Sequence, residues 1–284
     1  MFILDETRSR ALEAELRPLF DAGESLEVIA AVLGRHARMD LVRGVVNFGL
    51  RPYASALDEG VLFRDGLVTL VNGPLYALDL RYGFEMRGED MLPSGRAGAL
   101  LARSSDVVIA NIGPERLPYT RYVVRDAPDF SCFHPNATLE RSGDELLRPG
   151  EALIVRGGSE IVSLRHVAGA RFLSLCAAPR WAIDWVFDRE TLRPMAQSVA
   201  HVDDSQLITC LEVAAWLKSD MLLESVATLT SHSAHFVRWK AIQSLASLDN
   251  ETAVRCVHAA ATDGHPAIRA AAQRTLASLD TAAA

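Results

Sequence analysis

Two similar fifteen-residue segments follow one another near the end of the chain. The stretch HFVRWKAIQSLASLD covers residues 235–249, and PAIRAAAQRTLASLD covers residues 266–280. Apolar, basic and turn positions all align at one constant offset, 269 minus 238, or 31 residues. A fixed offset of this size is typical of stacked helical repeats, each of which buries its apolar face only against its neighbours. The sequence therefore predicts that the last part of the chain is an array of paired helices.

The order of signals within one repeat predicts a helical hairpin. Residues 249–280 contain a helical stretch, an Asp-Gly-x-Pro turn and a second helical stretch with Arg269 one turn in. Pro266 suits the first turn of a helix, where its missing N–H costs no hydrogen bond. This unit resembles a HEAT-like repeat, and the unit before it matches more loosely, with His235 in place of Pro266. The resemblance implies a surface that binds a partner protein, and the alternative is packing on the rest of the chain or self-association.

The rest of the chain divides into a helical start and a long strand-rich region. Apolar residues recur at helical spacing within residues 1–40, which predicts a pair of helices packed on a sheet, and the alternative is a helix pair for dimerisation or for a partner. Residues 41–194 instead contain short apolar runs such as LYALDLRYG and EALIVRGG, separated by Gly, Pro, Asp and Asn. These runs predict an antiparallel sandwich or barrel. The predicted fold class is therefore α+β and multidomain, with residues 195–284, led by a helix from Ser205, forming the repeat array.

The stretch LRPGEALIVRGGSEIVSL, residues 147–164, resembles the second half of a cupin barrel. In that family a Pro-Gly turn leads to a strand, a second Gly turn and a strand with a metal-binding His. The turns here are Pro149-Gly150-Glu151 and Arg156-Gly157-Gly158, and glycine supplies the positive φ that such turns need. Ile161 stands where the family has its His, and the segment PYTRY, which aligns with the first cupin motif, contains no His. The resemblance therefore implies a cupin-like barrel without the usual metal ligands.

Three side chains near predicted strands are candidates for a displaced metal centre. His134 and His166 lie at the edges of predicted strands, Glu160 lies just after the second turn, and Cys132 is an alternative ligand. Imidazole and carboxylate groups suit iron or manganese. This set implies an alternative function, a cupin-type iron- or manganese-dependent oxygenase or isomerase. In the other interpretation each histidine lies at a turn or on the surface, and no cofactor is bound.

A second candidate site needs no metal. In the predicted strand LPYTRYVV, alternation places Tyr119 and Arg121 on one face and Tyr122 on the other. An inward Arg121 would bind a carboxylate or phosphate of a small ligand through its planar guanidinium group. Tyr119, Tyr122 and Glu160 are the other predicted ligand contacts. The alternative is an Arg121 that points outward to solvent.

Composition and missing motifs narrow the class of function. The formal net charge of −7 argues against non-specific binding of nucleic acid, which needs Lys and Arg to replace counterions. The first residues contain neither a secretory signal nor a membrane-spanning stretch, so we expect a cytoplasmic protein. No Gly-x-Ser-x-Gly elbow or His-Glu-x-x-His pair is present. The favoured function is therefore a non-catalytic binding or adaptor protein, in which the barrel holds a small ligand or peptide and the repeats bind a protein. A homodimer that pairs through its sheets is a further prediction.

Overall fold

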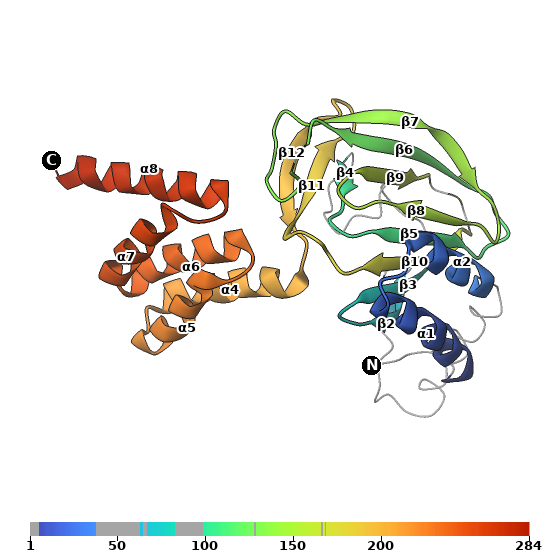
Figure 1. The fold of residues 1–284 in the computed structure, drawn as a ribbon, viewed down its shortest axis with the longest axis horizontal. Coiled ribbons are helices and arrows are strands. Elements are labelled where there is room, and N and C mark those ends of the chain that lie inside the picture. The colour runs from blue at the N-terminus through green and yellow to red at the C-terminus, as the bar shows by residue number, and fades with distance from the viewer. Residues whose placement is uncertain are drawn as a thin grey trace. The chain divides into compact units, whose positions relative to one another are not determined.

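The structure is a computed structural model that describes residues 6–37, 63–64, 67–82, 99–127, 129–165, 167 and 169–283. Contacts divide the chain into two compact units. The first unit comprises Met1–Phe130 and His134–Ser198, and the second comprises Ser131–Phe133 and Val199–Ala284. The first unit contains sheets and two helices, and the second is helical (Figure 1).

Two helices cover one face of the largest sheet in the first unit (Figure 1). Helix α1 spans Glu6–Asp21 and helix α2 spans Leu26–His36. Ser25 is the N-cap of α2, and its hydroxyl accepts a hydrogen bond from the Val28 N–H. The apolar stripes of both helices are buried against the sheet, as the helical spacing predicts. The shared buried cluster includes the helix residues Leu12, Leu16, Ile29 and Leu33 and the sheet residues Leu78 and Leu80.

The largest sheet has six antiparallel strands in the order β1-β2-β3-β10-β5-β8. The strands span Phe63–Arg64 (β1), Leu67–Asn72 (β2), Tyr76–Tyr82 (β3), Arg171–Ala177 (β10), Val107–Asn111 (β5) and Ala152–Val155 (β8). Successive side chains of a strand point to opposite faces. Leu78 and Leu80 of β3 pack beneath the helices, so Asp79 and Arg81 lie on the opposite, inner face of this sheet.

Two three-stranded sheets make up the rest of the strands that the structure describes in the first unit. One has the order β7-β6-β9 and the other β12-β11-β4; their strands span Thr138–Leu147 (β7), Leu117–Arg125 (β6), Glu160–Leu164 (β9), Pro194–Val199 (β12), Ile183–Asp188 (β11) and Ala99–Ala102 (β4). Val107 and Phe172 of the large sheet share a buried cluster with Tyr119 and Leu164 of the β7-β6-β9 sheet. The predicted antiparallel sheets are therefore confirmed and pack face to face, but the described strands do not close into one barrel.

Glycine is required in both turns that the cupin resemblance singles out. Gly150, before β8, and Gly158, before β9, have positive φ values of 79° and 75°, which other residues adopt only with strain. Gly157 is needed for space, because a Cβ atom there would lie 2.6 Å from the carbonyl carbon of Ser105. The sequence of each turn is thus explained by its backbone conformation or by its close packing.

The carboxylate of Asp106 links the turn Arg156-Gly157-Gly158 to the segment that contains Arg180. It accepts a hydrogen bond from the Gly157 N–H at 2.8 Å, across 51 residues of sequence. It also accepts one from Nη2 of Arg180 at 2.5 Å, across 74 residues. Arg180 donates in addition to the Gly157 carbonyl at 3.2 Å. The turn is therefore held at both its N–H and its C=O group.

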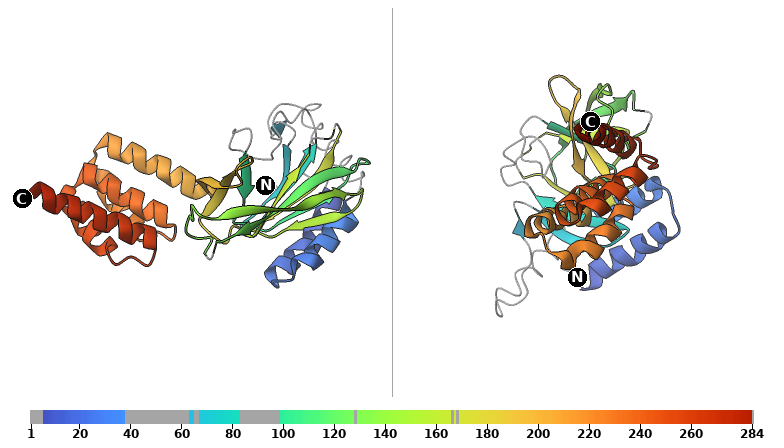
Figure 2. Two further views of the ribbon diagram at one scale, coloured as in Figure 1. Left: turned by 90° about the horizontal axis from the view of Figure 1, so that it is seen from above. Right: turned by 90° about the vertical axis from the view of Figure 1, so that its left-hand side faces the viewer.

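The second unit is a stack of helices (Figure 2). They span Val202–Leu217 (α4), Leu223–Thr228 (α5), His235–Leu248 (α6), Asn250–Ala260 (α7) and Pro266–Ala283 (α8), with short 3-10 helices at Asp220–Leu222 (η1) and Leu229–Ser231 (η2). Helix α6 packs on α4, α5 and α7, and α7 packs on α8, which confirms the predicted stack of hairpins. Pro266 and His235 each begin the second helix of a hairpin, as the alignment predicts. Among the described residues, no helix has both the length and the apolar character needed to cross a membrane.

Candidate functional site

The predicted ligand contacts on β6 form an ion-pair cluster. Arg121 binds Glu160 on β9, with Nη1 3.1 Å from Oε2, and its Nε lies 3.6 Å from Oε1 of Glu145 on β7. The Tyr119 hydroxyl donates a hydrogen bond to Oε2 of Glu145 at 2.5 Å. Burial, and then this hydrogen bond, raises the pKa of Tyr119, so the hydroxyl remains a donor at neutral pH. Two carboxylates therefore balance the single charge of Arg121, whose side chain is only 18% exposed.

Tyr122 lies on the other face of β6. In the pairing with β9, Tyr122 stands opposite Ile161, whereas Arg121 stands opposite Val162. Adjacent residues of a strand point to opposite faces, so Tyr122 does not join the Arg121 cluster. The structure thus brings together Tyr119, Arg121 and Glu160 but not Tyr122, and a ligand role for these residues stays a prediction.

The described members of the predicted metal centre have other contacts. The His134 ring lies 5.7 Å from that of Trp185, and its buried Nε2 has no hydrogen-bond partner among the described residues. Glu160 binds Arg121 and also accepts a hydrogen bond from the Arg156 N–H at 2.9 Å. Within the described part of the chain, no three His, Cys, Asp or Glu side chains lie close enough to hold a metal ion. The predicted metal centre of His134, His166 and Glu160 stays a prediction, because His166 lies outside the described residues.

A polar cluster that the sequence analysis does not single out lies on the inner face of the large sheet. Arg81 and Asp79 of β3 are neighbours there, with Nη2 of Arg81 3.7 Å from Oδ2 of Asp79. Oδ1 of Asp79 accepts a hydrogen bond from the Thr69 hydroxyl at 2.9 Å. Arg103, just after β4, donates through Nη1 to Sγ of Cys176 on β10 at 3.9 Å. Asp79, Arg81, Arg103 and Cys176 are called the inner-face cluster below.

The inner-face cluster has an excess of positive charge. The Arg81 side chain is 24% exposed, and its Nε is buried with no hydrogen-bond partner in the part of the chain that the structure describes. Burial lowers the pKa of Arg81, the Asp79 carboxylate opposes this shift, and the nearby Arg103 adds to it. A guanidinium nevertheless keeps its charge at physiological pH. Two cations and a single carboxylate, that of Asp79, therefore lie in a partly buried region, where unbalanced charge is costly.

One signal in the sequence points to this cluster. In LYALDLRYG the residues alternate, with Leu78 and Leu80 separating Ala77, Asp79 and Arg81. Such alternation predicts a strand with one apolar and one polar face. Two opposite charges two residues apart lie on the same face, and this strand is therefore the place where sequence reasoning alone could have searched for a polar site.

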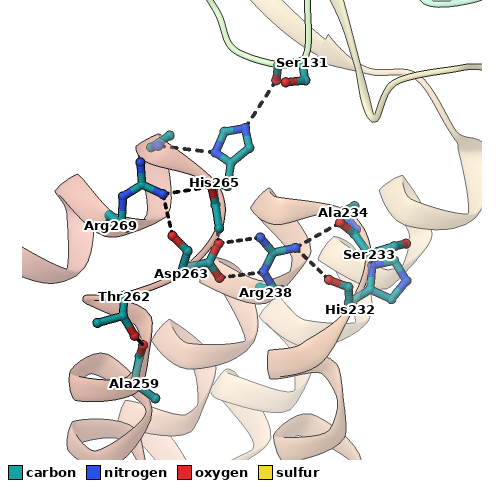
Figure 3. Close-up of polar contacts among 12 residues, drawn as sticks. Ser131, His232, Ser233, Ala234, Arg238, Ala259, Thr262, Asp263, His265 and Arg269 are labelled. Atoms are coloured by element: carbon teal, nitrogen blue, oxygen red, sulfur yellow. Dashed lines mark hydrogen bonds and ion pairs between the residues drawn. The ribbon is translucent and has the colours of Figure 1, made fainter.

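Each helical repeat has an arginine that closes its own loop (Figure 3). Nη1 of Arg238 donates to the carbonyl oxygens of His232 and Ser233 at 2.8 and 2.9 Å. Nη1 of Arg269 donates to the two equivalent carbonyls, 31 positions later, at 2.6 and 2.8 Å. The repeated arginine is therefore a structural residue of the hairpin turn.

The loop before α8 contains a second contact point of the stack, the ring of His265 (Figure 3). This ring stacks on that of His235, with centroids 3.7 Å apart. Its Nε2 lies 3.4 Å from the Ser131 carbonyl oxygen and 3.4 Å from Sγ of Cys132, the alternative metal ligand. Burial, and then the positive potential of His265 and Arg238, lowers the pKa of His235 to about 4. The His235 ring is therefore neutral at physiological pH.

The first helix of the array exposes large apolar side chains. Val213, Trp216 and Leu217 of α4 are 48%, 79% and 53% exposed, and Met221 of η1 is 91% exposed. Spacings of three and four residues place the three α4 residues on one side of the helix. These four residues are called the α4 apolar surface. Single exposed apolar residues are common, but a group of them indicates a site of interaction.

Comparison with protein families identifies the end of the chain. Residues 222–284 match the family model described as HEAT repeats. The match covers helices α5 to α8, which form the two hairpins, and confirms the resemblance of the repeats. No curated protein matches the chain.

Several solved structures are similar to part of the chain, and one of them is described as a member of a cupin superfamily. A hydroquinone 1,2-dioxygenase, in complex with Cd²⁺ and 4-hydroxybenzonitrile, matches at 11% identity with a TM-score of 0.28, over 41% of this chain and 66% of that chain. A sugar phosphate isomerase from a cupin superfamily, from Silicibacter pomeroyi, matches at 13% identity with a TM-score of 0.25, over 48% of this chain and 74% of that chain. HEPD from Streptomyces albus, with 2-hydroxyethylphosphonate and Fe(II) bound, matches at 14% identity with a TM-score of 0.27, over 61% of this chain and 41% of that chain. This chain thus spans just under two thirds of the dioxygenase chain, and the likeness concerns the fold alone.

Proposed function

We propose that this chain is a non-catalytic binding protein, whose helical repeats bind a partner protein and whose strand-rich unit holds a small ligand or peptide. The observation that carries this proposal is the α4 apolar surface on the first helix of the array. Stacked helical repeats commonly bind other macromolecules through an extended face. The partner surface expected here is apolar at its centre, because the α4 apolar surface contains no charged residue.

The contacts of the array favour a preformed binding surface. Arg238 ties two successive hairpins by binding Asp263, and Ile242, Val257 and Ile268 share one buried cluster across α6, α7 and α8. Helix α4 packs on α6 of this core. A preformed surface loses less conformational entropy on binding than a disordered one, so more of the interaction free energy appears as affinity.

Trp216 is the expected energetic centre of the interface. Tryptophan is enriched among the few interface residues that dominate binding energy, and its burial removes roughly 150–250 Å² from water. The flexible thioether chain of Met221 adapts to irregular apolar partners. Truncation of both side chains is therefore expected to weaken the interaction far more than truncation of an apolar residue elsewhere on the array.

Affinity purification with the full chain as bait tests the proposal. The wild type is compared with the double variant Trp216→Ser/Met221→Ser and with Leu279→Ser, which removes an apolar side chain of α8 that is 43% exposed. We expect a protein that co-purifies with the wild type and the control but not with the double variant. Calorimetry on the purified pair should then show binding at least about tenfold weaker for the double variant.

Two results would overturn the partner-binding proposal. One is a set of co-purifying proteins that does not change with the double variant. The other is self-association: if sedimentation velocity shows a dimer of the full chain that dissociates in the double variant, the α4 apolar surface binds a second copy instead of a different protein.

A further inference from the structure

We propose that Arg81 and Arg103 form a binding site for the oxyanion group of a small molecule, a carboxylate or a phosphate, on the inner face of the six-stranded sheet. This inference rests on the ligand-binding part of the proposed function and names the chemical class of the ligand. It is independent of the repeat array, which contributes no residue to the site.

The register of the sheet places the site on one face. Arg81 stands opposite Phe172 and Asp79 opposite Ser174, both on β10. Phe172 belongs to the buried cluster that faces the β7-β6-β9 sheet, and Cys176 packs against the same cluster. Directly opposed residues of an antiparallel pair share a face. Arg81 and Cys176 therefore both lie on the side of the sheet away from α1 and α2, and Arg103 reaches the same face through its contact with Cys176.

The hydrogen-bonding capacity of Arg81 is largely unused. A guanidinium has five N–H donors. In the described part of the chain, the carboxylate oxygen nearest to it is Oδ2 of Asp79 at 3.7 Å, which is beyond hydrogen-bond distance, and its buried Nε has no partner there. Asp79 is itself held by the Thr69 hydroxyl. Buried donors without acceptors are rare in native proteins, so this group indicates a missing acceptor.

Arg103 contacts a thiol and, within the described ranges, no carboxylate. Its side chain contacts Sγ of Cys176 at 3.9 Å, and a thiol is a weak acceptor. Among the described residues no ion pair joins Arg103 to an acidic side chain. An oxyanion bound between the two arginines would accept hydrogen bonds from both and neutralise the excess charge. Arginine is suited to carboxylate and phosphate groups because its planar donor fork matches their geometry.

The ion-pair cluster around Arg121 in the same unit shows the contrast. Arg121 has two carboxylates, Glu160 and Glu145, within 3.1 and 3.6 Å. These two carboxylates neutralise the charge of Arg121 inside the protein, so an external anion would gain less by binding to it. The charge balance therefore favours the inner-face cluster over Arg121 as the place where an anionic ligand binds.

Thermal unfolding of the full chain with added anions tests the inference. Inorganic phosphate and succinate are added separately, up to about 10 mM and at constant ionic strength, to the wild type and to Arg81→Gln, Arg103→Gln and Arg148→Gln. Arg148 is the matched control because its side chain is 70% exposed. We expect one of the two anions to raise the Tm of the wild type and the control, and the shift to be lost in Arg81→Gln and Arg103→Gln. Which anion acts distinguishes a phosphate ligand from a carboxylate ligand.

A second readout separates a binding role from a structural one. If Arg81 only stabilises the fold, Arg81→Gln lowers the Tm without ligand and leaves the anion-dependent shift intact; if it binds a ligand, the Tm without ligand is unchanged or higher. No shift with either anion, or an equal shift in Arg81→Gln, overturns the inference. The variant Trp216→Ser/Met221→Ser should keep the anion-dependent shift, so failure of the anion site and failure of partner binding are distinguishable.

Discussion

The guanidinium of Arg238 binds the carboxylate of Asp263 through two contacts, Nε to Oδ2 at 3.0 Å and Nη2 to Oδ1 at 2.8 Å. Its third nitrogen, Nη1, binds the carbonyls of its own loop. One side chain therefore joins the loops of two successive hairpins. Both side chains are only 16% exposed, so solvent screens this pair less than a surface ion pair.

Replacement of Arg238 by Ala is expected to lower the free energy of unfolding by about 1–2 kcal/mol, because it leaves the Asp263 carboxylate without its bidentate partner. Urea denaturation of the full chain, followed by helical circular dichroism, measures the change. Arg255→Ala is the control, since Arg255 pairs with Glu251 on the open surface of α7, at 63% and 85% exposure. Equal effects of the two substitutions would contradict the structural role of Arg238.

The stability of the helical unit is expected to fall as pH drops from about 6.5 towards 4. The folded-state pKa of His235, about 4, is below its ordinary value of 6.5. The unfolded state therefore binds more protons in this window, and the free energy of unfolding decreases as pH falls. The charged and titratable groups that face His235 are His265, Arg238 and Asp263.

Denaturation of the wild type and of His235→Gln at several pH values between 7.5 and 4 checks this prediction, and the variant should show a shallower dependence. Asp263 acts at lower pH. Burial alone would raise its pKa, but hydrogen bonds from Arg238 and the His265 N–H outweigh burial and lower it below 3.8. Stability from Asp263 is thus lost only as pH falls below about 4. If the free energy of unfolding of His235→Gln depends on pH above 4 as steeply as that of the wild type, the role of His235 is disproved.

Gly157→Ala is expected to destabilise the first unit by roughly 2 kcal/mol or more, because the added Cβ would lie 2.6 Å from backbone atoms of Ser105. Gly264→Ala is the matched control, since its added Cβ meets nothing within 4 Å. Thermal unfolding of both variants measures the difference. A tolerated Gly157→Ala would show that the turn moves away from Ser105 at little cost.

Metal analysis by plasma mass spectrometry tests the alternative function of a cupin-type iron or manganese enzyme. We expect well below one equivalent of iron or manganese in the purified chain, because Glu160 is bound to Arg121 and Ile161 occupies the position of the family's His. The double variant His134→Ala/His166→Ala should not change the metal content. About one equivalent that disappears in the variant would establish the metal centre and reject the non-catalytic proposal.

The sequence predicts the array well because its signals are local. Pro266 and the repeated Arg fix the start of α8 and the turn before it, and the leading helix begins at Val202, close to the predicted Ser205. The acidic residues Asp203 and Asp204 extend this helix by stabilising its N-terminal turn.

The partners of a strand residue are harder to predict because they depend on register. Tyr119 and Arg121 are correctly placed on one face, but Glu145 comes from β7, which pairs with β6 through a bulge next to Arg121. A shift of one residue would have turned Glu145 to the other face. Arg81 and Arg103 are missed for the same reason, since no local pattern connects β3 to the segment after β4.

The hydrogen bonds of Asp106 also set an order of events during synthesis. Asp106 leaves the ribosome 51 residues before Gly157 and 74 residues before Arg180. At typical elongation rates of about 5–20 residues per second, Arg180, the second donor to this carboxylate, is synthesised on the order of 4–15 s after Asp106. These two hydrogen bonds of the strand-rich unit can therefore form only seconds after Asp106 is made, and the last contact of the turn forms only once β10 has been made.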